Sequence, residues 1–152
     1  MFKIESDLIL LDVNATDAED VIRLLCGKLE DLGYISPDHV HAILERERKY
    51  PTGLPTKPVC VALPHGEAEG VHESALAFAR LRTPVIFQNM ADSNEALHVK
   101  MVFLLVNSDP GNQVKALRKL SEMFADPGQL SSLAILIEKN EVVAMLTEIL
   151  TD

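Results

Sequence analysis

One apolar segment near the middle of the chain, Val59–Leu63, constrains the fold more than any other. Five apolar residues in a row, several of them strand formers, predict a short strand covered on both faces, as in a parallel or mixed sheet flanked by helices. Pro64 ends this strand, because proline has no N–H for the ladder and keeps the preceding residue extended. His65 therefore falls just past the carboxyl end of the strand, at the edge where open α/β sheets bind their ligands.

His65 is followed by Gly66, which leaves room for another molecule to approach. A histidine in this place can act as a nucleophile, a base or a ligand. It can equally be a loop histidine without chemistry, since position in a fold does not by itself assign a function. From its position alone, these alternatives stay open.

Further strand patterns lie on both sides of this segment. A short apolar run at Leu8–Leu11 and the segment Val99–Val106, nearly all apolar beyond Lys100, predict two strands. The runs Ala75–Leu81 and Val85–Phe87 predict either two strands or one strand interrupted around Thr83-Pro84.

Five helices are predicted from start signals followed by apolar residues at helical spacing. The second should end near Lys49, because three prolines and a glycine break the ten residues that follow it into a loop. This order of elements predicts an α/β fold in a single domain, residues 1–152, with no internal repeat. The five start signals are a capping box at Thr16–Glu19, Ser36-Pro37, the turn after Val106, Asp126-Pro127 and Asn140.

The composition is that of a globular protein with an acidic surface. Length is 152 residues, hydrophobic content 47% and charged content 24%, which fits one domain with one core. A formal charge of -9 argues against a nucleic-acid partner, because a phosphate backbone would be repelled. An acidic surface suits a basic protein partner better.

The location can also be predicted. No run approaches the length of a membrane-spanning helix, and the first residues include acids where a signal peptide would have its apolar region. Two cysteines, Cys26 in a predicted helix and Cys60 in a predicted strand, make a disulfide framework improbable and indicate a reducing compartment. We therefore expect a cytoplasmic protein without direct membrane insertion.

Several familiar chemistries lack their motifs. The chain has no phosphate-binding loop of the Gly-x-x-x-x-Gly-Lys type, no dinucleotide fingerprint and no Gly-x-Ser-x-Gly elbow. His39 and His41 are two apart in a predicted helix and so point to different faces, while His72 and His98 are placed in loops. This spacing is weak for a metal site. Cys60 is interpreted as a small buried side chain, and neither a metal nor a cofactor is predicted.

One combination makes chemical sense around His65. Arg46 ends the second helix within Glu45–Arg48, and Thr52 and Gly53 follow in the loop that leads to the histidine strand. Arginine offers paired donors for phosphate oxygens, threonine adds a hydroxyl and glycine permits close approach. A neutral histidine beside them is a phosphate acceptor. The alternative is that Arg46 and Arg48 are solvated charges neutralised by Glu45 and Glu47.

Gln113 is a further candidate. It lies four residues before Leu117 on the inner stripe of the predicted third helix, so it falls on the buried side of the first turn. A buried glutamine needs hydrogen-bond partners. If the preceding strand is parallel to the central one, Gln113 reaches the same edge of the sheet as His65.

These motifs resemble a known family. The runs Glu45-Arg46-Glu47-x-x-x-Pro51-Thr52-Gly53-Leu54 and Val61-Ala62-Leu63-Pro64-His65-Gly66 are similar to the EIIA domain of the fructose and mannitol branch of the bacterial phosphoenolpyruvate-dependent sugar phosphotransferase system. The resemblance spans nearly the whole chain, including the helix that begins near Gln113. Glu67-Ala68 and Gln113 are most similar to galactitol-type members.

The resemblance implies a phosphocarrier with a mannitol-EIIA-like fold, in which a mixed, mostly parallel sheet has helices on both faces. His65 would take a phosphoryl group from phospho-HPr and pass it to a cysteine of EIIB, which phosphorylates sugar entering through EIIC. Arg46 would hold the phosphoryl group, with Thr52 as a possible neighbour. EIIB and EIIC would be supplied by other proteins, and no metal or nucleotide is implied.

One position departs from the family pattern. Mannitol and fructose relatives usually have a second active-site histidine where this chain has Gln113. Glutamine donates a hydrogen bond but carries no positive charge. Two other functions also stay open: a regulatory phosphoprotein of the nitrogen-related EIIA type, and a non-catalytic or metal-dependent domain on the same fold.

Overall fold

A long antiparallel hairpin, β4 (Ala75–Asn89) and β5 (Asp92–Val106), forms the centre of a five-stranded sheet. Strand β1 (Ile9–Val13) is parallel to β4, and β3 (Cys60–Ala62) is parallel to β5. Strand β2 (Gly53–Leu54) is antiparallel to β3 and parallel to the far end of β4. Three of the five pairings are parallel, so the predicted mixed, mostly parallel sheet is confirmed.

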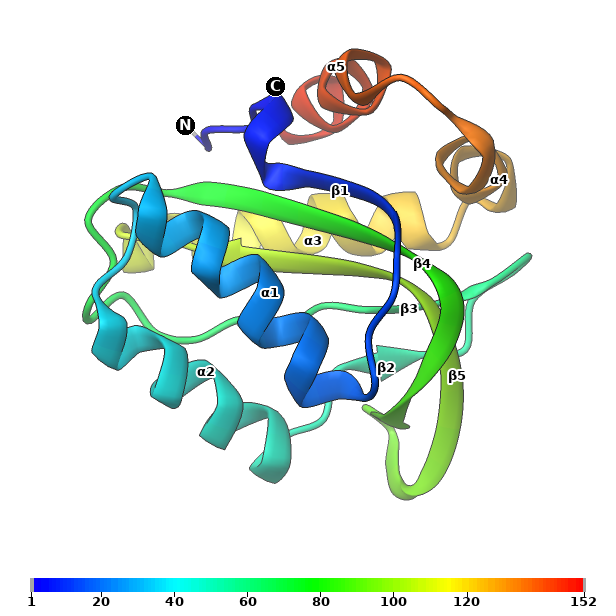
Figure 1. Ribbon diagram of the computed structural model, residues 1–152, viewed down its shortest axis with the longest axis horizontal. Helices are drawn as coiled ribbons and strands as arrows, with labels where there is room; N and C mark the ends of the chain where they lie inside the picture. Colours follow the sequence, from blue (N-terminus) through cyan, green and yellow to red (C-terminus); the bar gives the residue numbers. More distant parts are fainter. Residues whose placement is uncertain (1, 152) are drawn as a thin grey trace.

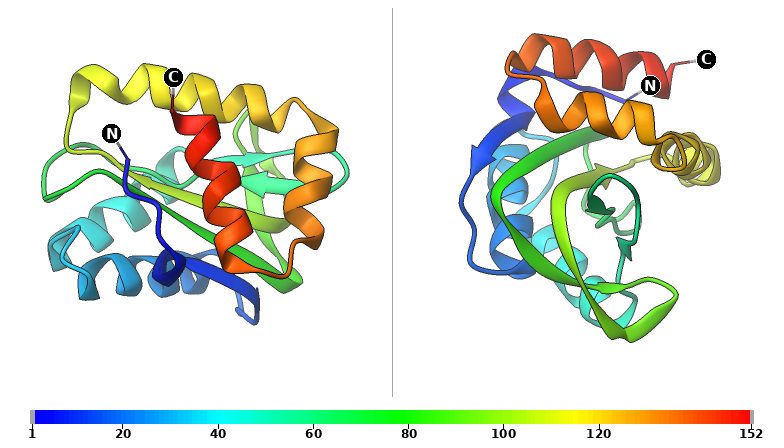
Figure 2. Two further views of the ribbon diagram at one scale, coloured as in Figure 1. Left: turned by 90° about the horizontal axis from the view of Figure 1, so that it is seen from above. Right: turned by 90° about the vertical axis from the view of Figure 1, so that its right-hand side faces the viewer.

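Helices cover both faces of this sheet (Figures 1 and 2). The computed structural model describes residues 2–151, and within them α1 and α2 lie on one face and α3, α4 and α5 on the other. Within residues 2–151, no helix is both long enough and apolar enough to cross a bilayer. Their bounds are Ala18–Asp31 (α1), Pro37–Lys49 (α2), Gln113–Phe124 (α3), Pro127–Ile135 (α4) and Lys139–Leu150 (α5), with 3-10 turns at Ser6–Leu8 and Pro110–Asn112.

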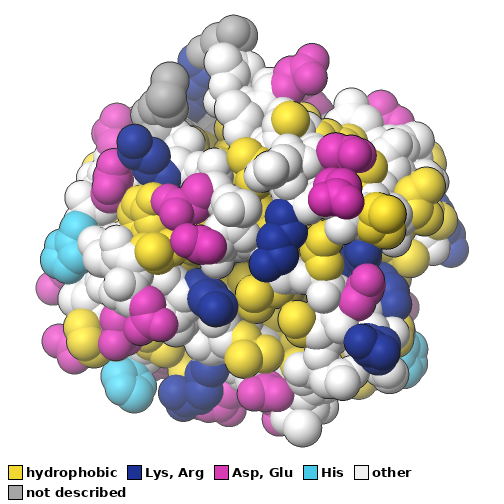
Figure 3. Space-filling model, turned by 45° about the horizontal axis from the view of Figure 1, so that its top comes forward, with side chains coloured by type: hydrophobic (Ala, Val, Ile, Leu, Met, Phe, Trp, Pro, Cys, Tyr) yellow, Lys and Arg dark blue, Asp and Glu magenta, His cyan; other side chains and the backbone are white. Residues whose placement is uncertain are grey.

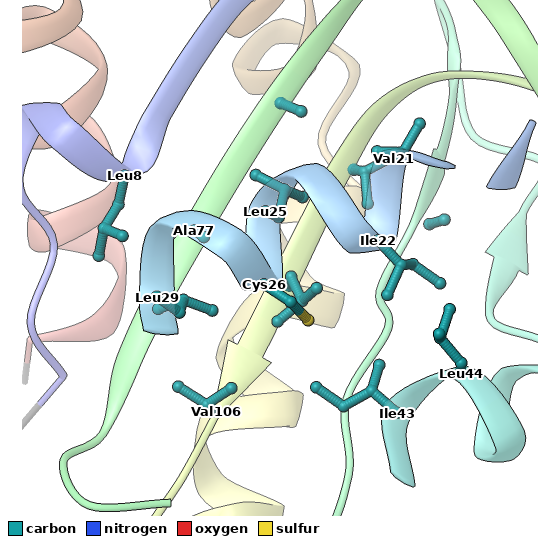
Figure 4. Close-up of a cluster of buried hydrophobic side chains, with 14 of the residues drawn as sticks. Leu8, Val21, Ile22, Leu25, Cys26, Leu29, Ile43, Leu44, Ala77 and Val106 are labelled. Atoms are coloured by element: carbon teal, nitrogen blue, oxygen red, sulfur yellow. The ribbon is translucent and has the colours of Figure 1, made fainter. Parts of the chain in front are cut away.

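Two hydrophobic clusters hold the layers together, because alternate residues of a strand point to opposite faces. The alanines of β4, such as Ala77, pack against Leu25 and other side chains of α1 (Figure 4). Leu76 and Phe78 point the other way, into the cluster formed with α3, α4 and α5. The small alanine side chains leave room for α1 to lie close to the sheet.

Charges are mixed on the face that carries α4 and α5. Acidic and basic side chains are interspersed there, and hydrophobic side chains reach the surface between them (Figure 3). The formal charge of -9 is therefore not gathered into one acidic patch on this face.

Two predicted helix starts are wrong by one or two residues. Asp17, not Thr16, caps α1 by accepting from the N–H of Asp20, and the Thr16 N–H donates to the Asp20 carboxylate. Aspartate is as good an N-cap as threonine, so neighbouring candidates compete. The last helix begins at Lys139 after Glu138, which leaves Asn140 inside it.

The strands also differ in length from the prediction. The central strand β3 is limited to Cys60–Ala62. Of the two alternatives for residues 75–87, the single interrupted strand is confirmed, because β4 is one strand whose register shifts between Arg80 and Val85. Pro84 falls within this irregularity, where no ladder bond is required of it. Strand β5 starts as early as Asp92 and so includes His98, which was wrongly expected in a loop.

Gly53 is required by the contact between β2 and β4. A Cβ at this position would lie 2.6 Å from the backbone oxygen of Gln88. We expect Gly53→Ala to lower the free energy of unfolding by about 2 kcal/mol, because backbone cannot move aside cheaply. Urea denaturation measures the change. Gly27→Ala is the control: Gly27 is an exposed helical residue whose added Cβ would meet nothing within 4 Å beyond its chain neighbours and the backbone of its own helix, so this change should stabilise the protein slightly. An unchanged midpoint for Gly53→Ala would contradict the argument.

Candidate active site

His65 lies at the carboxyl end of β3 and is held there by one backbone hydrogen bond and by one bond from its ring to a backbone carbonyl. The Leu105 N–H donates to the Pro64 carbonyl at 3.1 Å, which keeps the histidine loop beside β5. The His65 Nδ1 is 2.8 Å from the Leu63 carbonyl oxygen. Because a carbonyl can only accept, Nδ1 carries the proton and Nε2 keeps its lone pair. Nε2 is thus the nucleophilic atom of this ring.

The surroundings keep His65 neutral. Partial burial lowers the pKa of His65 from its ordinary value; the bond to Leu63 opposes this change, and the positive charge of Arg46 reinforces it. The ordinary pKa of a histidine is about 6.5. At pH 7 the ring is therefore mostly in the form that can attack an electrophile.

Arg46 extends from the last turn of α2 into the same cleft as His65. This cleft has a volume of about 470 Å³ and is also lined by Gln113. The guanidinium carbon lies 5.5 Å from the centre of the Tyr50 ring, and within residues 2–151 the buried Nε has no hydrogen-bond partner. A cation with donors to spare beside a neutral histidine is suited to hold an anion.

The neighbouring charges do not neutralise Arg46 in the way the alternative interpretation requires. Glu45 pairs with Lys49 at 3.3 Å, and Arg48 pairs with Glu19 at 3.2 Å on the exposed side of the helix. Glu47 accepts two hydrogen bonds from Thr52. Solvated helix-end charge thus describes Arg48, whereas Arg46 faces the cleft.

Gln113 begins α3, and its amide orientation follows from a chain of hydrogen bonds. The Asp109 N–H donates to Asn107 Oδ1 at 3.0 Å, so the other end of the Asn107 amide is its donor, Nδ2. This Nδ2 donates to Gln113 Oε1 at 2.7 Å. Because the oxygen of Gln113 is engaged, its Nε2 remains as a donor in the cleft. Strands β3 and β5 are parallel, which is why Gln113 and His65 share one edge of the sheet.

The structure does not bring Thr52 into this cleft. Its side chain is 3% exposed, and its hydroxyl donates to Glu47 Oε1 at 2.8 Å while accepting from the Leu63 N–H at 3.2 Å. The close approach that Gly53 permits is to the backbone of Gln88, not to a ligand.

Sequence reasoning missed the roles of Glu47 and Asn107. Burial raises the pKa of Glu47 to about 7, although both bonds from Thr52 and the charge of Arg46 act to lower it. Asn107 is 4% exposed. In the sequence, Glu47 is only a carboxylate five residues before Thr52, and Asn107 is only an amide at the start of a turn. Neither position identifies the hydrogen-bond partner of the side chain.

The other histidines are separate from this cleft. His39 is buried and its Nδ1 lies 2.9 Å from the Glu69 carbonyl oxygen, whereas His41, His72 and His98 are exposed. In the part of the chain from residue 2 to 151, no three His, Cys, Asp or Glu side chains are grouped so that they could hold a metal ion.

Comparison with known proteins identifies a family that matches this chain. The model of the family described as "Phosphoenolpyruvate-dependent sugar phosphotransferase system, EIIA 2" matches residues 3–149. The galactitol-specific EIIA component of Escherichia coli K12 is 28% identical over 126 residues, 83% of each chain. Enzyme IIA for mannitol from Escherichia coli, solved in complex with phosphorylated enzyme IIB, has a TM-score of 0.77 at 25% identity over 97% of this chain and 99% of that one. The nitrogen regulatory protein IIA-Ntr from Neisseria meningitidis has a TM-score of 0.79 at 29% identity, over 93% and 94%.

Proposed function

Because this chain belongs to the EIIA type 2 family of the phosphoenolpyruvate-dependent sugar phosphotransferase system, we propose that it accepts a phosphoryl group from phospho-HPr on His65 and passes it to a cysteine of a separate EIIB. EIIA components of this system carry a phosphoryl group on histidine. The observation that carries the assignment to His65 is its unprotonated Nε2 in a cleft shared with Arg46.

Each transfer exchanges one phosphorus bond for another. The Nε2 lone pair of His65 forms a bond to phosphorus as the bond to the donor histidine of HPr breaks, and the proton stays on Nδ1. The Leu63 carbonyl, 2.8 Å from Nδ1, then stabilises the positively charged ring. In the second step a cysteine thiolate of EIIB attacks phosphorus, and the ring leaves as neutral imidazole.

Arg46 and Gln113 supply what this chemistry needs from the protein. Phosphoryl transfer depends mainly on positioning and on stabilising charge on the phosphoryl oxygens. The Arg46 guanidinium offers donors and a positive charge, and Gln113 Nε2 offers a neutral donor. Neither a metal nor a nucleotide takes part in these steps.

The partner surface proposed here surrounds the mouth of the cleft. Pro110 and Leu117 line the cleft, and the next residue after Gln113, Val114, is 72% exposed. Apolar groups around a reactive centre are suited to a protein that docks and leaves. We propose that phospho-HPr and EIIB use this rim in turn, in the cytoplasm, and that EIIC in the membrane supplies a hexitol similar to galactitol.

The nitrogen-related relative favours a second candidate. Its fold is as similar to this chain as that of the mannitol protein, with TM-scores of 0.79 and 0.77. In this alternative His65 is phosphorylated in the same way, but the output is binding of a target rather than transfer to EIIB.

The test uses the purified protein with phosphoenolpyruvate, Enzyme I and HPr. Peptide mass spectrometry under conditions that preserve phosphohistidine should place one acid-labile phosphoryl group on His65. Addition of candidate EIIB proteins should then move it to a cysteine. Phosphorylation with no EIIB able to accept would favour the regulatory function, and absence of phosphorylation would reject both.

Gln113→His should slow hydrolysis of the phosphorylated protein by about fivefold, because a charged donor stabilises the phosphoryl oxygens by roughly 1 kcal/mol more than a neutral one. Loss of acid-labile phosphate over time measures the rate. Arg118→His, exposed on the same helix, is the control and should behave as the parent. Equal rates in Gln113→His and the parent would remove this position from the stabilisation of the phosphorylated state.

A further inference from the structure

The two groups that meet in the cleft come from different elements. Arg46 is on the last turn of α2, and His65 follows β3. Their relative position therefore depends on a connection between the end of α2 and the end of β3. The residue next to Arg46, Glu47, provides it.

Glu47 binds the start of the loop that enters β2. Its carboxylate accepts from the Thr52 N–H at 2.9 Å and from the Thr52 hydroxyl at 2.8 Å. Both oxygens of the carboxylate are used, one by each donor. A carboxylate that accepts two hydrogen bonds in a partly buried place fixes its partner more firmly than a single bond does.

Thr52 in turn binds the residue that orients His65. The Leu63 N–H donates to both the hydroxyl and the carbonyl of Thr52, at 3.2 and 3.3 Å. The Leu63 carbonyl accepts from His65 Nδ1 at 2.8 Å. When Glu47 is ionised, the Thr52 hydroxyl gives its one proton to the carboxylate and uses a lone pair for the Leu63 N–H, so each donor in this series of hydrogen bonds has an acceptor.

We propose that Glu47 and Thr52 are positioning residues for phosphoryl transfer, which act by holding the backbone of Leu63, whose carbonyl keeps the proton on Nδ1 of His65, and by tying the Arg46 end of α2 to Leu63. The proposal rests on the proposed function of His65. It also assigns Thr52 a role other than contact with phosphate, because its hydroxyl proton is already donated and its side chain does not line the cleft.

The test uses three variants and one control in the full chain. Thr52→Val keeps the N–H and removes the hydroxyl, Glu47→Gln exchanges one accepting oxygen for a donor, and Thr52→Ser keeps the hydroxyl. Glu45→Gln removes a charge from the same helix end, but Glu45 is exposed and pairs with Lys49 instead. Two measurements are made: the rate of phosphoryl transfer from phospho-HPr, and the tautomer and pKa of His65 from ¹⁵N NMR of the unphosphorylated protein.

Thr52→Val and Glu47→Gln should each slow transfer by about tenfold, since small displacements of reacting groups cost rate steeply. Both should also shift His65 from a single Nδ1–H tautomer to a mixture and change its pKa. Thr52→Ser should remain within about twofold of the parent rate, and Glu45→Gln should match the parent in both measurements.

The outcomes separate the proposal from its alternatives. If the tautomer and the pKa of His65 are unchanged in Thr52→Val and Glu47→Gln, the proposal is overturned at any transfer rate. Slow transfer in Thr52→Val with an unchanged His65 ring would assign Thr52 to phosphate contact instead. An equal effect of Glu45→Gln would overturn it in favour of a general charge effect. If the parent protein accepts no phosphate, the proposed function fails, while the NMR measurement still decides the positioning.

Discussion

Replacing His65 by glutamine should abolish phosphorylation by phospho-HPr rather than slow it. Glutamine occupies a similar volume and can donate to the Leu63 carbonyl through its amide, but it has no nitrogen lone pair that can attack phosphorus. Among the described residues that line the cleft, His65 is the one histidine; Arg46 is permanently charged, Gln113 presents an amide, and the two glutamates there would form an acyl phosphate, not a phosphohistidine. The measurement is incorporation of acid-labile phosphate from phosphoenolpyruvate through Enzyme I and HPr, with loss to the detection limit.

Two exposed histidines serve as matched controls for this prediction. His72→Gln and His98→Gln remove the same side chain at positions outside the cleft, so both should incorporate phosphate at the parent rate. Unfolding of each variant in urea confirms that the fold is retained. Phosphate incorporation by His65→Gln, or its loss in His72→Gln, would show that the phosphoryl group goes elsewhere.

Replacing Arg80 by methionine should lower the free energy of unfolding by about 3 kcal/mol, because it leaves buried carbonyl groups without donors. Arg80 lies on β4, is 3% exposed and binds both oxygens of Asp12 at 3.0 and 3.1 Å. Its Nη1 also donates to the carbonyls of Leu133 and Leu136 at the end of α4, at 3.0 and 2.6 Å. One side chain thus connects β1, β4 and α4, and methionine keeps an unbranched apolar stem without any of these bonds.

Urea denaturation of Arg80→Met and Arg82→Met gives the comparison. Arg82 is two residues further along the same strand, is exposed and makes one long bond of 3.4 Å to the Asp12 carbonyl. Its replacement should change the free energy of unfolding by less than about 0.5 kcal/mol. Similar losses in both variants would mean that strand propensity or charge, and not the buried contacts, accounts for the effect.

Local patterns in the sequence predicted much of this fold because they record local physics. The continuous apolar run Val59–Leu63 and the proline after it, Pro64, placed His65 past a strand end, and the structure has it there. Predictions were less accurate where neighbouring residues could each serve as the start of a helix. Asp17 replaces Thr16 as the cap of α1, and Glu138 replaces Asn140 as the residue before α5.

Partners of polar side chains could not be predicted in this way. Arg80 is a strand arginine in the sequence, and only the approach of the α4 carbonyls and of Asp12 makes it a buried connection. The same is true of Thr52, which the sequence offered as a possible phosphate contact and whose hydroxyl is engaged by Glu47 and Leu63.

The sequence by itself determined the order of strands and helices, the family and the set of side chains able to handle a phosphoryl group, since residue type and spacing suffice for these. The tertiary structure alone decided which of those side chains share the cleft, which nitrogen of His65 is free and which polar groups hold the others in place. Hydrogen bonds between residues far apart in the chain form only after packing has brought their donors and acceptors together, so no local sequence pattern predicts them.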